Sequence, residues 1–105
     1  MARFDVYANP GASAQNPPYL LDLQNDLYDG LDTRMVIPLK TLVPFAQMKR
    51  PERLMPLFHI AGERFLLETP KMAAVPARIL KQPVASLASE QSSIVMALDF
   101  LFNGY

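Results

Sequence analysis

Few side chains in this sequence could support catalysis, and they lie apart from one another. His59 is the only histidine, and it lies inside an apolar run from Leu57 to Ile60. A histidine acts as a general base or a metal ligand only when neighbouring groups hold and polarise its ring. The apolar residues beside His59 offer no such group, so we expect it to have a structural role.

Four aspartates follow one another every three or four residues: Asp22, Asp26, Asp29 and Asp32. On a helix this spacing would gather the carboxylates on one face. However, the segment lacks the glycine and the terminal glutamate of a calcium-binding loop. Asp29-Gly30 is instead a typical turn dipeptide. We therefore predict a turn here and no metal site.

Covalent and phosphate-binding chemistry have no support either. The chain contains no cysteine, which excludes disulfides, thiolate metal ligands and a thiol nucleophile. Its four glycines are isolated, so there is no phosphate-binding loop. The serines at positions 86 to 93 lack the surroundings of a nucleophilic serine. The sequence therefore predicts neither a catalytic centre nor a cofactor. We expect a protein that acts by binding a partner.

The composition indicates one small domain spanning residues 1–105. Ten basic and ten acidic side chains give a formal net charge of zero. Because the charges are scattered singly, no basic stripe marks a nucleic-acid surface, and DNA or RNA is not an expected partner of this chain alone. The amino-terminal residues lack the apolar core of a signal peptide, and no apolar run approaches the roughly 20 residues of a membrane helix. We expect a cytoplasmic protein without membrane contact.

Short apolar runs predict a mainly β fold with one helix at the carboxy-terminal end. The runs read as strands by their alternation or their branched and aromatic residues: Phe4–Ala8, Tyr19–Gln24, Met35–Leu39, Leu54–Ile60, Arg64–Glu68 and Val75–Leu80. The first alternates like a half-buried strand, with Phe4, Val6 and Ala8 on one face and Tyr7 on the other. The fourth and fifth should form a hairpin across residues 61–63, and the sixth should be the last strand.

Three prolines refine this architecture. Pro38, Pro56 and Pro76 each fall inside a run that otherwise reads as a strand. Proline cannot donate to a strand ladder, and it favours edges, strand ends or bulges. We therefore predict bent, partly unpaired strands in a small curled sheet or a partly open barrel.

The residues from 93 onward predict an apolar helix that stops at Gly104. Ser86 or Ser89 would cap its amino end, and Glu90 would complement the positive end of its dipole. The apolar stripe is unusually wide and comprises Ile94, Leu98, Leu101 and Phe102, with Val95 and Phe100 beside them. This exceeds what one packing face requires, so we expect burial on two sides, one of them by a second subunit.

Six segments, taken in order, resemble the CcdB family of toxin–antitoxin toxins. They are Phe4–Tyr7, Pro18–Leu27, Thr33–Leu39, Pro51–Leu57, Met72–Pro76 and Ala97–Tyr105. The resemblance extends over nearly the whole chain. Its most specific parts are the segment Arg34–Leu39 and the Ala-Val-Pro unit at residues 74–76, at its distance from the terminal helix.

This resemblance implies an SH3-like barrel with a small additional sheet and a long carboxy-terminal helix at the axis of a homodimer. Family members bind the dimerisation region of the DNA gyrase A subunit and trap the covalent gyrase–DNA cleavage complex, without catalysis by the toxin. A CcdA-type antitoxin neutralises them through a disordered tail that folds on docking, and the two proteins together repress their operon. Operator DNA is thus an expected partner only through the antitoxin complex.

The resemblance places gyrase binding at the last three residues, Asn103, Gly104 and Tyr105; without it they read as a plain helix stop. Gly104 fits the family pattern and Tyr105 keeps a bulky end, but Asn103 stands where the best-known members carry tryptophan. A ring at a desolvated hot spot is worth about 1–3 kcal/mol. One alternative is therefore an attenuated relative that binds antitoxin without poisoning gyrase. Another is an endoribonuclease of the MazF or Kid type, for which Arg34 beside Thr33 is the nearest pairing.

Overall fold

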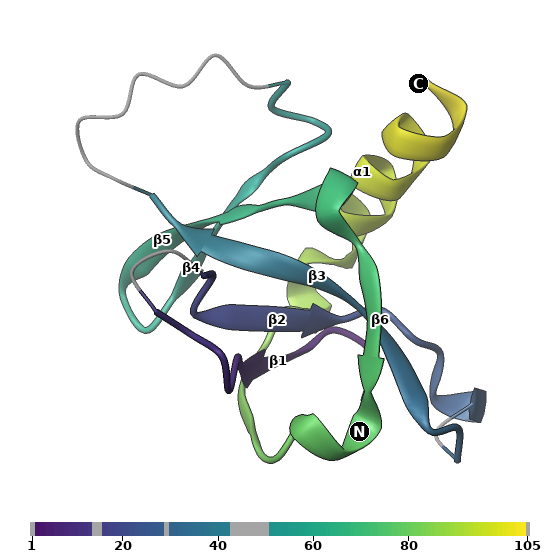
Figure 1. Cartoon of the computed structure of the whole chain (residues 1–105). Coiled ribbons are helices and arrows are strands. Elements are labelled where there is room, and N and C mark those ends of the chain that lie inside the picture. The colour runs from purple at the N-terminus through teal and green to yellow at the C-terminus, as the bar shows by residue number, and fades with distance from the viewer. Residues whose placement is uncertain (1, 14–15, 29, 43–50, 105) are drawn as a thin grey trace.

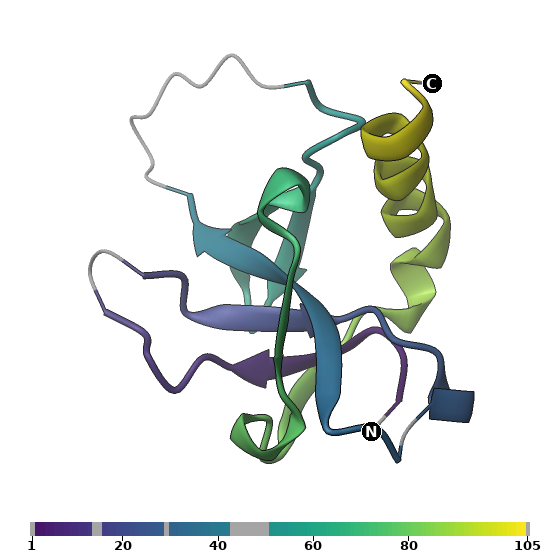
Figure 2. The same cartoon turned by 45° about the vertical axis from the view of Figure 1, so that its right-hand side comes forward.

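The computed structural model describes residues 2–13, 16–28, 30–42 and 51–104, and in these ranges a curled sheet carries one α-helix (Figure 1). The strands curve into a half-barrel, and the helix α1 (Gln91–Asn103) stands along one side of it (Figure 2). The expected mainly β fold with a carboxy-terminal helix is confirmed.

Seven strands and four short 3-10 helices precede α1 in the described ranges. The strands are β1 (Asp5–Ala8), β2 (Tyr19–Asp22), β3 (Thr33–Thr41), β4 (Leu57–Ile60), β5 (Glu63–Leu67), β6 (Ala73–Pro76) and β7 (Pro83–Ser86). The 3-10 helices are η1 (Asp26–Tyr28), η2 (Thr69–Lys71), η3 (Ala77–Ile79) and η4 (Ala88–Glu90). Neighbouring strands are antiparallel in the order β4-β5-β3-β2-β1-β7. The remaining strand, β6, pairs with the first half of β3 and belongs to the same sheet.

Side chains on both faces of the sheet contribute to buried cores. The larger core lies under α1, where Ile94 and Ala97 are fully buried among side chains of the strands. A smaller core gathers Tyr7, Leu20, Val36 and Leu80. Successive residues of a strand point to opposite faces, so Val6 joins the larger core while Tyr7 joins the smaller one. The alternation predicted a strand with one buried face and one exposed face. This prediction is wrong at Tyr7, which is only 1% exposed.

Pro38 lies in the middle of the longest strand without breaking the sheet. On one side β3 pairs with β2, where Leu20 lies opposite Pro38. On the other side β3 pairs with β6 as far as Val36 and with β5 from Leu39 onward. The Pro38 carbonyl points to this second side, where it accepts the N–H of Glu68 at 2.9 Å. The N–H that proline lacks would point the same way, so it is missing at the junction of two partner strands.

The other two prolines stand at strand ends, as proline requires. Pro56 immediately precedes β4, which begins at residue 57 rather than at residue 54. Pro76 ends β6, so the strand predicted over Val75–Leu80 is wrong in extent. The chain turns into η3 there because proline ends the pairing, and the Leu80 N–H bonds back to the carbonyl of residue 77. A further strand, β7, follows where none was predicted and pairs with β1.

Candidate functional site

The carboxy-terminal end of α1 is an exposed, regularly capped turn. Gly104 takes the left-handed conformation with φ of 79°, and its N–H donates to the Phe100 carbonyl at 3.1 Å. Glycine suits this position because a Cβ is disfavoured at positive φ. Asn103 is the last helical residue, and both Asn103 and Gly104 are exposed. The predicted stop at Gly104 is confirmed, while Tyr105 lies outside the described residues.

Phe102 also belongs to this exposed turn. Its side chain is 69% exposed, so this member of the predicted apolar stripe is not buried within the single chain. The reason is the length of the helix: the last turn of α1 extends beyond the strands of the half-barrel (Figures 1 and 2). Phe102, Asn103 and Gly104 therefore form a continuous exposed surface, which we call the terminal turn.

The earlier turns of α1 anchor the terminal turn to the sheet. Ile94 and Ala97 are fully buried, and Val95 and Leu98 pack against the same core. The helix also contacts η2. Because packing of an apolar face supplies most of the stability of a short helix, this anchoring holds the terminal turn in a defined place.

The amino end of α1 is built differently from the prediction. The Ser86 hydroxyl accepts the N–H of Ala88 at 3.2 Å, before η4, so Ser86 does not cap α1. Ser89 lies inside η4, and Glu90 occupies the N-cap position of α1 without a side-chain hydrogen bond to the helix. The predicted capping of α1 by Ser86 or Ser89 is therefore wrong, because the short helix η4 lies between Ser86 and the start of α1.

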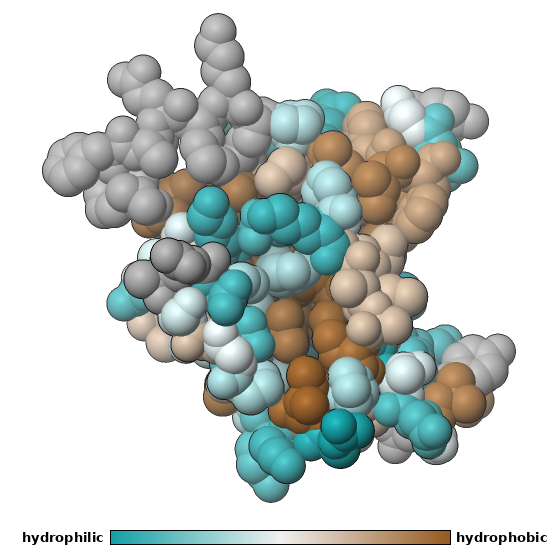
Figure 3. Space-filling view, in the orientation of Figure 1, coloured by the Kyte–Doolittle hydropathy of each residue, from teal (hydrophilic) through white to brown (hydrophobic). Residues whose placement is uncertain are grey.

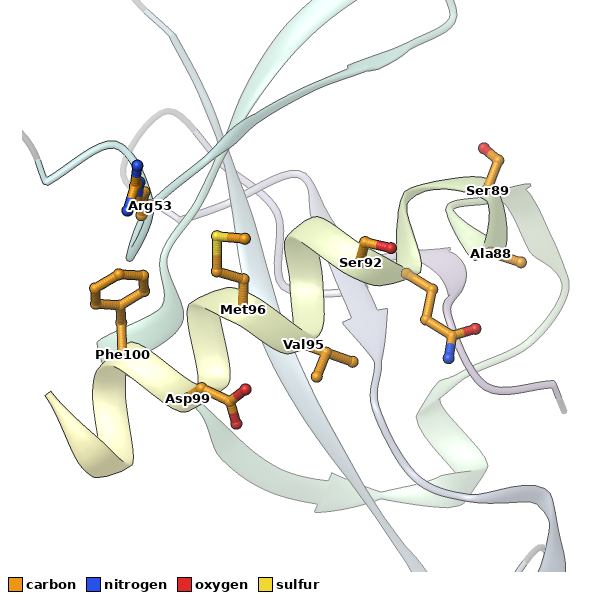
Figure 4. Close-up of a pocket in the computed structure, with 9 residues that line it drawn as sticks. Arg53, Ala88, Ser89, Ser92, Val95, Met96, Asp99 and Phe100 are labelled. Carbon is orange, nitrogen blue, oxygen red and sulfur yellow. The ribbon is translucent and has the colours of Figure 1, made fainter. Parts of the chain in front are cut away.

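An open hollow of about 730 Å³ follows the outward side of α1. Figure 4 shows Met96 and Phe100 on one side of the helix, facing Arg53 of the segment before β4. Val95 and Asp99 line the hollow further round the helix. Met96 is 45% exposed, and Val95 and Phe100 are only partly buried. The apolar surface that the sequence predicted in excess on α1 is thus open in the single chain.

The four aspartates do not come together. Asp22 is fully buried at the end of β2 and forms an ion pair with Arg34 of β3. Asp26 accepts a backbone N–H from the amino-terminal segment at 2.7 Å, and Asp32 is exposed before β3. Asp29, with the turn predicted there, lies outside the described residues. Because this segment is not one helix, the regular spacing of the aspartates does not bring their carboxylates together.

Sequence reasoning missed the buried pair of Asp22 and Arg34. The Arg34 Nε donates to both carboxylate oxygens, at 3.1 and 3.2 Å, and Nη2 also donates to the Gln24 carbonyl at 3.2 Å. The available signal was a pair of opposite charges beside apolar residues, with Asp22 at the end of β2 and Arg34 near the start of β3. Thr33 is exposed beside Arg34, but the guanidinium points into the protein. The pairing considered for RNA cleavage therefore has its cation directed at Asp22.

His59 is exposed on β4, opposite Arg64 of β5. Within the described ranges, no three His, Cys, Asp or Glu side chains gather where they could hold a metal ion. No helix in those ranges is both long and apolar enough to cross a membrane. The terminal turn and the hollow beside it are features of the described surface that suit contact with another macromolecule.

A comparison with protein-family models gives a match over nearly the whole chain. The model described as CcdB protein matches residues 3–104. The matched range contains every strand of the half-barrel, the whole of α1 and the terminal turn. On this match and this fold, the chain belongs to the CcdB family of toxins from toxin–antitoxin systems.

Proposed function

We propose that this protein poisons DNA gyrase. It acts as one domain over residues 1–105, binds the dimerisation region of the gyrase A subunit through Asn103, Gly104 and Tyr105, and traps the covalent cleavage complex. It needs no cofactor and catalyses no reaction of its own. Its site of action is the cytoplasm, where gyrase and DNA are found.

The observation that carries this proposal is the exposed terminal turn on an anchored helix, within a family match that includes it. A contact surface that is already ordered loses little conformational entropy on binding. Phe102 adds an aromatic side chain, 69% exposed, directly beside Asn103. In this proposal Phe102 supplies part of the apolar area that tryptophan provides in other members.

The proposal includes a homodimer with the α1 helices at its axis. Its support is the apolar surface of Val95, Met96 and Phe100 that faces the open hollow. Burying such surface on a second copy would be favourable at about 25 cal/mol per Å². The dimer would present two terminal turns together, which suits a gyrase A region that is itself dimeric.

A CcdA-like antitoxin completes the proposal. Its disordered tail folds on docking and neutralises the toxin, and the complex represses the operon. The formal net charge of zero supports a role for operator DNA only within that complex, because non-specific DNA affinity arises mainly from cations on phosphates. An endoribonuclease is less well supported, since Arg34 is fully buried against Asp22.

A gyrase cleavage assay tests the function. Supercoiled plasmid, gyrase from the host and ATP are incubated with the protein, and linear DNA is scored after detergent and protease. We expect linear DNA with the wild-type protein and none with Gly104→Glu, which places bulk and charge in the terminal turn.

Gly104→Ala is the matched control for backbone strain. Either substitution adds a Cβ at φ of 79°, where no other atom lies within 4 Å, and each carries strain of about 1–2 kcal/mol. We expect Gly104→Ala to keep most of the cleavage activity. Equal activity of Gly104→Glu and wild type would remove the terminal turn as the gyrase site. Absence of linear DNA from a folded wild-type dimer would favour the attenuated relative, and total RNA added to the same preparation would reveal an endoribonuclease.

A further inference from the structure

The terminal turn contains a dipeptide whose two residues can react with each other. Asn103 is followed by Gly104, and both residues are exposed at the end of α1. Figure 3 shows teal and white surface at the upper right of the view, where this end of α1 lies in Figure 1. Asparagine is a thermolabile residue, because the nitrogen of the next peptide bond can attack its side-chain amide. The residue that follows an asparagine therefore decides how easily the attack occurs.

Among the asparagines of this chain, position 103 is the most favourable for this attack. Asn9 and Asn16 each precede a proline, whose nitrogen carries no proton to give up. Asn25 precedes an aspartate, whose side chain crowds the attacking nitrogen. Gly104 has no side chain, and the space where a Cβ would stand is open. The side chain of residue 103 can therefore approach the Gly104 nitrogen closely.

The native turn restrains the reaction through a backbone hydrogen bond. The Gly104 N–H donates to the Phe100 carbonyl at 3.1 Å, and Asn103 is still part of the helix. The attack requires this hydrogen bond to open and the Asn103 backbone to leave its helical conformation. Helix ends open locally at little cost. We therefore expect folding to slow the reaction by no more than about tenfold relative to the unfolded chain, since the net contribution of such a bond is small.

We propose that Asn103 and Gly104 form a self-modifying site, which converts Asn103 to aspartate and isoaspartate. The Gly104 nitrogen bonds to the Asn103 Cγ, the bond from Cγ to Nδ2 breaks, and the proton of the Gly104 nitrogen leaves with Nδ2 as ammonia. Water then adds its hydroxyl group to either carbonyl carbon of the imide ring and returns a proton to the ring nitrogen. Attack at one carbon gives aspartate, and attack at the other gives isoaspartate. Water is the sole co-reactant, and the closeness of the two groups in the chain favours the first step.

Either product alters the terminal turn. It adds a carboxylate at the carboxy-terminal end of α1, where the helix dipole is negative and where residues 100–103 include no basic side chain. Asp99 lies one turn earlier, in the i,i+4 relation in which like charges repel. Isoaspartate also lengthens the backbone before Gly104. For gyrase binding this consequence rests on the proposed function: each copy of the protein loses potency as it ages.

A peptide map of the full-length protein tests the site. Wild type, Gly104→Ala and Asn103→Gln are incubated at the growth temperature of the host and digested. Mass spectrometry then resolves the peptide with residue 103 into its amide, aspartate and isoaspartate forms. We expect fast conversion of wild type, within about tenfold of its rate in urea. Gly104→Ala should convert more slowly because its Cβ crowds the attacking nitrogen, and Asn103→Gln should stay unconverted because it needs a larger ring.

Several outcomes would overturn the site. Residue 103 that converts no faster than Asn25 in the same digest would show no special reactivity in this fold. Equal rates in wild type and Gly104→Ala, or aspartate without isoaspartate, would show that the imide route is not used. The map must resolve the peptide with residue 103, because Asp29-Gly30 can also form isoaspartate, without ammonia. The thermal midpoint of each variant verifies that it is folded.

The gyrase cleavage assay measures the consequence separately. Asn103→Asp carries the charge of the product, and Asn103→Gln is its matched control because it keeps the amide. We expect Asn103→Asp to require at least about tenfold more protein for the same amount of linear DNA, since a carboxylate is desolvated at the contact. Equal potency of the two variants would overturn the loss of potency with age. If fresh wild type yields no linear DNA, the proposed function fails, and the peptide map alone decides the self-modifying site.

Discussion

Asp22 and Arg34 form a charged contact that is closed off from solvent. Both side chains are fully buried, and the Arg34 Nη2 lies 2.5 Å from Asp22 Oδ2. The Asp22 Oδ1 also accepts the N–H of Gln24 at 3.0 Å. Taking two charges out of water is unfavourable, and such a pair persists only when further hydrogen bonds satisfy both partners. Here it joins the end of β2 to the first half of β3, where β6 also pairs.

Removing one partner of this pair should destabilise the protein strongly. Arg34→Met leaves the Asp22 carboxylate buried without its cation, and we expect the free energy of unfolding in urea to fall by about 3–5 kcal/mol. The double variant Asp22→Leu/Arg34→Met should lose less than the single variant, because it leaves no unpaired charge. A loss below about 1 kcal/mol in Arg34→Met would show that the pair behaves like an exposed one.

The hairpin of β4 and β5 shows how a turn sets an element. Ala61 and Gly62 join the strands, with φ of 53° and 83°, and Ile60 lies opposite Glu63 in the register. Two successive positive φ values are typical of a type I′ turn, which favours Asn-Gly because it twists with the strands. Ala61 is therefore the less suited of the two residues, because its Cβ is disfavoured at positive φ.

Ala61→Asn should stabilise the protein. Asparagine tolerates the left-handed conformation, so we expect the free energy of unfolding to rise by about 0.5–1 kcal/mol. Ala61→Val is the opposite control, since a β-branched residue at positive φ is strained, and its unfolding midpoint should fall. If the two variants unfold at the same urea concentration, the turn does not limit the stability of this hairpin.

The outward side of α1 is the element on which the proposed dimer depends. Met96→Glu places a charge in the middle of the apolar surface, and two copies would face each other near the axis. We expect a monomer by sedimentation velocity at concentrations where the wild-type protein is a dimer. Val84→Glu, at a 53% exposed residue of β7, should leave the dimer unchanged. A dimer that persists in Met96→Glu would place the interface elsewhere.

Elements whose signal is local were predictable from the sequence. The apolar runs located β1, β2, β3 and β5, and the glycine stop located the end of α1, because these patterns involve neighbouring residues. The strand β7 was missed since it is short, begins with Pro83 and is mostly exposed, so that only its pairing with β1 makes it a strand. The exposure of Phe102 and the buried Arg34 were equally out of reach, because each depends on where distant segments lie.

At the scale of the whole molecule, folding and association should be linked. If the dimer is the native form, its stability depends on protein concentration. A hundredfold increase adds about 2.7 kcal/mol per dimer, which should raise the thermal midpoint by roughly 5 °C for a chain of this size. Calorimetry across that range measures the shift. A constant midpoint would indicate a folded monomer, and Met96→Glu should show that behaviour.

The pairing of β1 with β7 also has a consequence for the time course of synthesis. Val6 pairs with Ala85, so about 80 residues separate the two partners, and at the usual rate of translation the first strand waits roughly 4–16 s for the last one. The helix that carries the terminal turn is made later still. During translation, a nascent chain therefore has an incomplete sheet and no terminal turn. Under the proposed function, translation itself delays the moment at which a new copy can bind gyrase.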